Sequence, residues 1–140
     1  MRKIISGRRS LEQSDFIFNV KVDNTSATSG PAGTFRLPLP SGTPTGGGAM
    51  SMEVEWGDGT TTYVNSANHG SAIHTYTNTG TYPNYTITIR GAIRGFKFGG
   101  MSSGNDDASK MTTIEQWGDF RFTENGTFRD CVNLNCPNVT

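Results

Sequence analysis

Ser71, Asp58 and His74 could be drawn as a serine–histidine–aspartate triad, in which the histidine would take the proton of the serine hydroxyl. A triad is recognised by geometry, however, and His74 stands in a His-x-Tyr pattern ahead of an alternating segment. That setting is typical of a strand histidine that hydrogen-bonds a neighbouring turn. We therefore interpret His74 as structural and predict that the protein is not an enzyme and has no catalytic residues.

The carboxylates form two further groups that could carry out chemistry. Glu53 and Glu55 are two residues apart, which places both on one face of a strand. We interpret them as a solvated face that also discourages edge-to-edge pairing. Asp106 and Asp107, with nearby amide and hydroxyl groups, offer the oxygen ligands that calcium prefers, but their spacing matches no dedicated calcium loop.

The two cysteines, Cys131 and Cys136, are close enough in sequence to form a small-loop disulfide or to remain two buried thiols. Zinc would need further ligands, and His69 and His74 lie far upstream. The glycines at 46–48 are not followed by the Lys-Ser/Thr pair of a phosphate-binding loop. We predict no metal site and no cofactor.

The composition indicates which elements must position these groups. The chain of 140 residues has 12 basic and 12 acidic residues, 18 glycines, 33% apolar residues and only 17% charged residues. Such a chain is poor in helix formers and rich in turn formers, which predicts an all-β fold with many loops. Zero net charge argues against binding nucleic acid by bulk electrostatics. No apolar run approaches the roughly 20 residues of a membrane span.

The first fifteen residues are a basic, polar segment without periodicity. Because no apolar stretch follows its positive charges, we expect no secretory signal. The segment is either a loose terminus or an arm that orders against a partner. We assign it to a docking arm whose positive charges meet acidic groups on that partner, with the charges carried by Arg2, Lys3, Arg8 and Arg9.

Alternation of apolar and polar residues predicts short strands along the middle of the chain. The pattern is clearest from Phe16 to Val22 and from Met50 to Trp56. Further strands are predicted at 35–39, at an edge because of its prolines, and at 63–64, 85–89 and 93–98. Six or seven short strands with turn signals between them predict an antiparallel sandwich over 16–100. We expect the arm at 1–15 and a short irregular extension at 101–140 to flank it.

The segment from Trp56 to Thr60 is the most informative in the chain. Trp56 is predicted to point into the core at the end of its strand. Gly57 and Gly59 permit backbone angles that a Cβ would forbid. Asp58 between them can accept hydrogen bonds from nearby backbone amides, which predicts a tight hairpin.

Four elements in order carry a family resemblance: Trp-Gly-Asp-Gly-Thr at 56–60, His-x-Tyr at 74–76, Gly-Thr-Tyr at 80–82 and an alternating strand at 85–89. This order resembles the PKD domain, an immunoglobulin-like β-sandwich. The resemblance implies scaffold roles for the turn and also for His74, Tyr76, Gly80 and Tyr82. Pro83-Asn84 departs from the family pattern, so the start of the following strand stays open.

A second resemblance lies near the C-terminus. Ile-Glu-Gln-Trp-Gly at 114–118 and Phe-x-x-Cys-x-x-Leu at 128–134 look like the lead-in to bacterial surface leucine-rich repeats of the BspA-like kind. The repeat unit occurs once, and a single unit cannot stack into a solenoid. In this interpretation Cys131 is a small buried apolar residue.

Together these features predict a non-enzymatic structural protein of a bacteriophage virion, such as a capsid decoration, head-fibre or tail-fibre module. Virion proteins are made in the host cytoplasm, which fits a β-sandwich without a secretory signal. We expect multi-copy or homo-oligomeric contacts with capsid, tail or sister subunits, and a host-surface glycan as a further partner. The alternative is an adhesion or glycan-binding module of a leucine-rich-repeat protein on a bacterial cell surface.

Overall fold

The computed structural model describes residues 15–39, 51–65, 72–78, 80–92, 96–98, 101–118 and 127–135. Several residues singled out in the sequence lie outside these ranges: the docking-arm residues Arg2, Lys3, Arg8 and Arg9, together with His69, Ser71 and Cys136.

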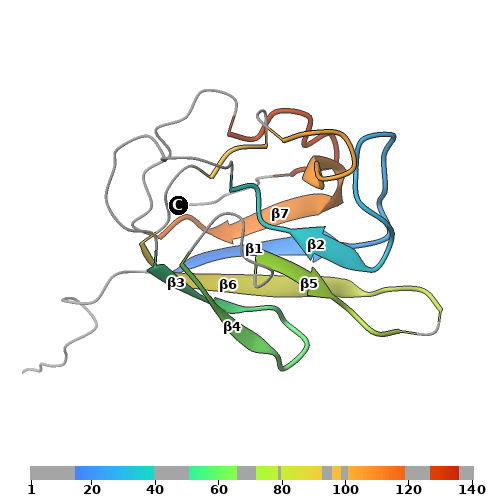
Figure 1. The fold of residues 1–140 in the computed structure, drawn as a ribbon. Coiled ribbons are helices and arrows are strands. Elements are labelled where there is room, and N and C mark those ends of the chain that lie inside the picture. Colours follow the sequence, from blue (N-terminus) through green and yellow to red (C-terminus); the bar gives the residue numbers. More distant parts are fainter. Residues whose placement is uncertain are drawn as a thin grey trace, which may run out of the picture.

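The described residues form seven strands in two antiparallel sheets (Figure 1). The larger sheet has five strands in the order β4-β3-β6-β1-β7, and the smaller one pairs β2 with β5. Their bounds are β1 Phe16–Lys21, β2 Thr34–Arg36, β3 Ser51–Glu55, β4 Thr61–Val64, β5 Ile73–Thr75, β6 Asn84–Ala92 and β7 Met111–Gln116. The all-β prediction is confirmed.

Strand alternation sets the two layers, as the sequence predicts. In β1 the residues at even positions are buried and those at odd positions are partly exposed. β3 also buries its even positions, Met52 and Val54, whereas β6 buries its odd positions Ile87 and Ile89. The smaller sheet covers this inner face, since the Phe35 ring on β2 lies 6.0 Å from the Phe18 ring on β1. The core lies between the two sheets.

Two predicted strands need correction. The strand predicted at 35–39 is confirmed only around its start, because β2 ends at Arg36. Leu37 and Leu39 stay buried without continuing the strand, beside Pro38, which has no N–H to donate. The predicted strand at 93–98 is wrong over its described part: Phe96 and Phe98 are buried, but residues 96–98 do not form a strand.

The start of the strand after Pro83, which the sequence leaves open, is now defined. β6 begins at Asn84, immediately after the proline, and runs for nine residues. It pairs with β1 on one side and β3 on the other. Among the described residues, no helix is long and apolar enough to cross a membrane.

The expectation of an irregular C-terminal extension is wrong for Met111–Gln116. This segment is β7, which pairs antiparallel with β1 and completes the larger sheet. The turn that follows, 127–135, also packs on the sandwich: Phe128, Cys131 and Leu134 lie against the core. Asn135 then forms a parallel bridge with Thr113 at the outer edge of β7.

Candidate functional site

The turn at 56–60 joins β3 to β4 with the geometry that the sequence predicts. Trp56 N–H donates to the carbonyl oxygen of Thr60 at 3.0 Å. Thr60 N–H donates to Oδ1 of Asp58 at 3.1 Å. Gly57 and Gly59 have φ angles of 90° and 91°, the left-handed region that glycine enters at little cost. The hairpin is therefore held by its own local bonds.

His74 on β5 contacts this turn across the two sheets. Its Nε2 atom lies 2.8 Å from Oδ2 of Asp58. The imidazole stacks on the Trp56 ring at 4.9 Å and meets the edge of Tyr76 at 4.5 Å. The Tyr76 hydroxyl donates to the carbonyl oxygen of Trp56 at 2.8 Å. The histidine is thus held by two aromatic rings and at one nitrogen, which is the structural role that the sequence indicates.

Two ionisable groups in this cluster have shifted pKa values. Burial raises the pKa of Asp58, but hydrogen bonds from His74 and Thr60 outweigh it, so the pKa lies below its usual value. Burial raises the pKa of Tyr76, with a smaller contribution from the Asp58 charge. The Asp58 carboxylate and the His74 ring thus form one hydrogen-bonded unit with the turn.

Gly80 and Tyr82, the other scaffold residues of the family pattern, lie at a different point of the fold. Tyr82 packs on the loop between β1 and β2, where a Cβ added to Gly33 would stand 2.6 Å from its hydroxyl oxygen. Lys21 donates from Nζ to the carbonyl oxygen of Tyr82 at 2.8 Å. Gly80 has a φ of 147° and is exposed. These residues shape loops rather than a reaction centre.

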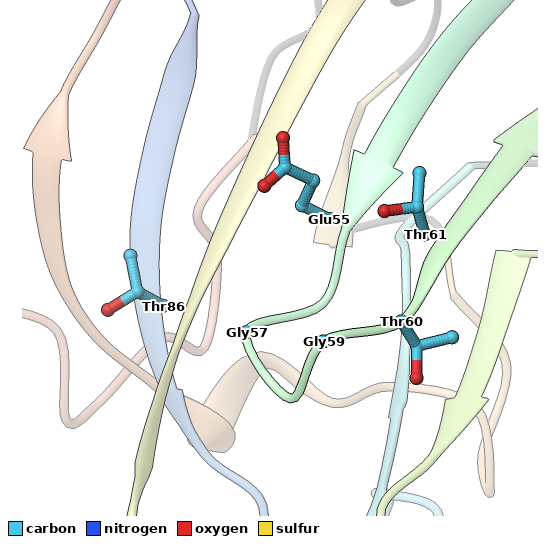
Figure 2. Close-up of a pocket in the computed structure, with 6 residues that line it drawn as sticks. All are labelled: Glu55, Gly57, Gly59, Thr60, Thr61 and Thr86. Carbon is cyan, nitrogen blue, oxygen red and sulfur yellow. The ribbon is translucent and has the colours of Figure 1, made fainter.

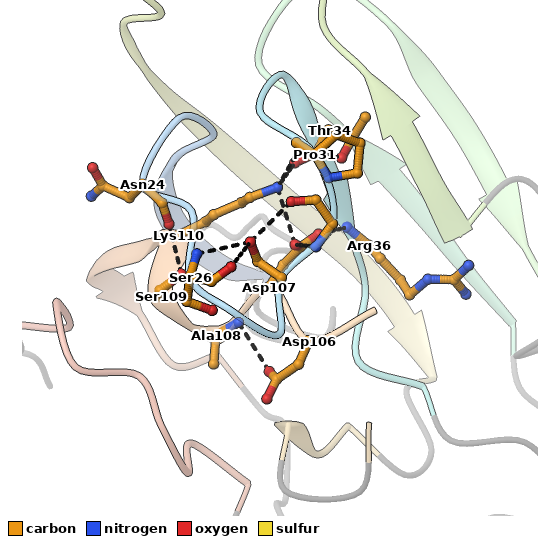
Figure 3. Close-up of polar contacts among 12 residues, drawn as sticks. Asn24, Ser26, Pro31, Thr34, Arg36, Asp106, Asp107, Ala108, Ser109 and Lys110 are labelled. Carbon is orange, nitrogen blue, oxygen red and sulfur yellow. Dashed lines mark hydrogen bonds and ion pairs between the residues drawn. The ribbon is translucent and has the colours of Figure 1, made fainter. Parts of the chain in front are cut away.

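The acidic pair considered for calcium belongs to a buried polar cluster, drawn in Figure 3. Asp107 Oδ1 accepts from Gly30 N–H at 2.9 Å, and its Oδ2 accepts from Arg36 N–H at 2.8 Å. Lys110, which is 0% exposed, lies 3.0 Å from Asp107 Oδ1. The positive charge beside Asp107 is therefore an ammonium of the same chain.

The Lys110 ammonium also donates to the carbonyl oxygens of Pro31 and Thr34, at 2.8 and 2.7 Å. Burial lowers the pKa of Lys110, while the Asp107 carboxylate opposes that shift. A buried charge is tolerated only when it is paired and hydrogen-bonded, and both conditions are met here. The cluster fixes the short 3-10 helix at Ala108–Lys110 to the β1–β2 connection and to β2. Sequence reasoning missed it.

Glu53 and Glu55 project from the outer face of the larger sheet, as predicted, but Arg90 joins them. The guanidinium donates from Nη1 to Oε2 of Glu53 at 3.1 Å and also bonds Glu55. Its Nε donates to Oδ2 of Asp15 at 3.1 Å. The hydrogen bond to Glu55 is the main reason that the pKa of Arg90 is raised. These glutamates form part of a charge network rather than an acid–base pair.

A small pocket of about 250 Å³ opens beside the turn on this outer face (Figure 2). Its wall is polar and is formed by Glu55, three threonines and two glycines: Thr60, Thr61, Thr86, Gly57 and Gly59. Nearby on β4, Tyr63 is 73% exposed and lies opposite Glu53. Alternation alone could have placed Tyr63 beside Glu53, because the strand pattern puts both on the polar face.

The part of the chain described here contains no group of three or more histidine, cysteine or acidic residues that could hold a metal ion. No family model, curated protein or solved structure matches the chain.

Proposed function

We propose that the chain is a non-enzymatic structural module of a bacteriophage virion, which uses an immunoglobulin-like, PKD-type sandwich for contacts with other proteins or surfaces. One observation supports a role without catalysis. The side chains best suited to acid–base chemistry serve the fold, because His74 bonds the turn through Asp58, and Asp107 bonds Lys110 and two backbone amides.

The PKD-type assignment is supported by how the motif residues meet in space. The turn at 56–60 is a hairpin between β3 and β4, and His74 and Tyr76 close over it from the facing sheet. The alternating strand of the motif is β6, which pairs directly with β3. Three of the four motif elements, which are separate in the sequence, thus form one packed unit, as expected of scaffold positions.

The virion assignment is an analogy with the β-sandwich modules of virion proteins. It predicts that mass spectrometry of purified particles detects the chain in many copies. Particles that contain none of it would overturn the proposal.

The docking arm can be tested in the same particles. Replacing Arg2, Lys3, Arg8 and Arg9 together by serine should lower incorporation, and higher salt should lower it further because exposed charges are screened. The control is Arg129→Ser, which removes an exposed arginine from the far end of the chain. Equal incorporation of both variants would move docking away from the arm.

A second candidate function, an adhesion module of a leucine-rich-repeat surface protein, is favoured by the C-terminal turn. Phe128, Cys131 and Leu134 of the repeat-like unit pack on the core, and Asn135 adds a parallel bridge to an otherwise antiparallel sheet. Repeat units bury their apolar face against a neighbour in this way. Further Phe-x-x-Cys-x-x-Leu units encoded after Thr140 would favour this candidate, whereas neighbouring head and tail genes would favour the virion.

A further inference from the structure

We propose that a neutral carbohydrate binds to the outer side of the larger sheet. The binding surface, called the Tyr63 face, consists of Glu53, Glu55, Thr61 and Tyr63 together with the pocket beside the turn. This inference deepens the proposed contacts with surfaces by placing the ligand on the fold, and such a site would bind the same ligand on a virion or on a cell surface. It depends on one exposed ring, one polar pocket and the charges between them.

The exposed ring is the first component. Tyr63 is 73% exposed, the largest exposure of any aromatic side chain among the described residues. Its cross-strand neighbour is Glu53, so the ring stands on the outer face, away from the core. A tyrosine combines a flat apolar surface with a polar hydroxyl, which suits a ligand with both C–H and O–H groups. A sugar ring is such a ligand.

The pocket supplies the second component. Glu55 and Thr61, which both line it, are direct cross-strand neighbours on β3 and β4. Thr61 is two residues from Tyr63 on the same strand face, a separation of about 7 Å. One or two sugar units could therefore contact the ring and the pocket together. The volume of about 250 Å³ is below that of typical sites for drug-sized ligands.

The hydrogen-bonding character of the wall favours a polyhydroxyl ligand. The Glu55 carboxylate can only accept hydrogen bonds, whereas threonine hydroxyls both donate and accept. A ligand must then offer hydrogen-bond donors to Glu55 and both donors and acceptors to the threonines, as vicinal hydroxyl groups do. Apolar ligands find no such match, because the pocket is lined by one glutamate, three threonines and two glycines and by no large apolar side chain.

The local charges favour a neutral ligand. Glu53 and Glu55 would repel phosphate or carboxylate groups, which argues against nucleotides and acidic sugars. The Arg90 guanidinium bonds both glutamates, so a metal cation would meet a positive charge next to its carboxylate ligands. Because Arg90 also holds the carboxylates in place, a neutral ligand would meet groups that are already oriented.

The test is an array of neutral oligosaccharides, followed by NMR titration of the full chain with methyl glycosides of glucose, galactose, mannose and N-acetylglucosamine. We expect binding that shifts the Tyr63 and Thr61 signals. Tyr63→Ala and Glu55→Gln should each weaken it about tenfold or more, and Tyr63→Phe should retain most of it because the ring remains. The matched control is Glu115→Gln, an exposed outer-face glutamate on the opposite edge strand.

Two results would overturn the proposal: no neutral glycan bound on the array or in the titration, or binding that Tyr63→Ala and Glu55→Gln leave unchanged. Thermal unfolding of each variant separates loss of binding from loss of fold. Removing the exposed Tyr63 ring should change the thermal unfolding midpoint little. The result of the sugar-binding test is independent of the virion experiment. A protein that is missing from particles could still bind sugar, and a protein that is present in particles could fail to bind it.

Discussion

Gly57 and Gly59 have nearly the same φ angle but different surroundings, and this difference can be measured. A Cβ at Gly57 would lie 2.5 Å from the carbonyl oxygen of Thr86 on β6, whereas one at Gly59 would meet nothing within 4 Å. Gly59→Ala should therefore cost only the backbone strain, about 1 kcal/mol. Gly57→Ala should cost about 3 kcal/mol or more, because β6 must also move. Equal shifts in urea unfolding would contradict this assignment of the turn.

The buried and exposed ion pairs of the chain should differ strongly in their contribution to stability. Asp107→Ala leaves the Lys110 ammonium buried beside two backbone amides that lose their acceptor, which should cost about 3–5 kcal/mol of unfolding free energy. The control is Asp23→Ala, which removes the partly exposed partner of Lys21 and should cost at most about 1 kcal/mol. Similar urea midpoints for the two variants would mean that the buried contacts of Asp107 do not contribute more to stability than an exposed ion pair.

Asp58 gives the hairpin a defined dependence on pH. Because its pKa in the folded protein lies below the usual 3.8, the ionised form stabilises the fold above that value. This contribution is lost as the pH falls from 3.8 through the folded-state pKa. Wild type should therefore lose its advantage over Asp58→Asn across this acidic range, as measured by urea midpoints at successive pH values. A constant difference between the two proteins would exclude Asp58 as the titrating group.

Sequence distance explains which site residues could be predicted. The hydrogen bonds of the turn connect residues two to four positions apart, and its glycine and aspartate residues predict such bonds. The pattern around His74 predicts a hydrogen bond to a neighbouring turn, and the structure gives Asp58 as its partner. The carbonyl partners of Lys110, in contrast, lie 79 and 76 residues away in the chain. A lysine beside a serine and an acidic pair is typical of a solvated loop, so nothing local indicates its burial.

At the scale of elements, the inward face of a strand could be predicted only where the strand pairs with its neighbours in a regular register. β1 and β3 alternate strictly, and their inward faces follow from the sequence alone. In β7 the buried Met111 and Ile114 are three residues apart, a spacing that does not suit a regular strand. The register between β1 and β7 shifts at two points, which brings both side chains to the inner face. Such a bulge depends on the partner strand and cannot be inferred from one segment.

The membership of β7 in the core has a direct consequence for stability. Ile114 is 2% exposed, so Ile114→Ala should cost about 2–5 kcal/mol. Val132, in the turn that follows, is 79% exposed, and Val132→Ala should change stability by about 0.5 kcal/mol or less. Guanidinium unfolding of both variants provides the comparison. If Ile114→Ala lowered the free energy of unfolding by less than about 1 kcal/mol, β7 would not be part of the core and would instead be a loosely attached extension.

At the scale of the whole molecule, β1 is the strand that unites the fold. It lies between β6 and β7, so the hairpin with the Trp56 turn, which joins the sheet through β6, and the C-terminal segment lie on opposite sides of β1. Aromatic contacts continue this connection, because Phe16 on β1 contacts both Phe96 and Trp117. The described segments after residue 100 therefore share a single core with those before it.

A shared core predicts one cooperative unfolding transition, and the two tryptophans can test it from opposite ends. Trp56 is fully buried beside the turn, and Trp117, directly after β7, packs on Phe16 and Phe128. In Trp56→Phe, fluorescence reports only the C-terminal end, and in Trp117→Phe only the turn. Within each variant, the fluorescence midpoint in urea should coincide with that from far-ultraviolet circular dichroism, even though Trp56→Phe lowers overall stability. If Trp117 fluorescence changed at lower urea than the dichroism, the C-terminal segment would be unfolding by itself. The residues from 101 onward would then be an appendage to the sandwich rather than part of it.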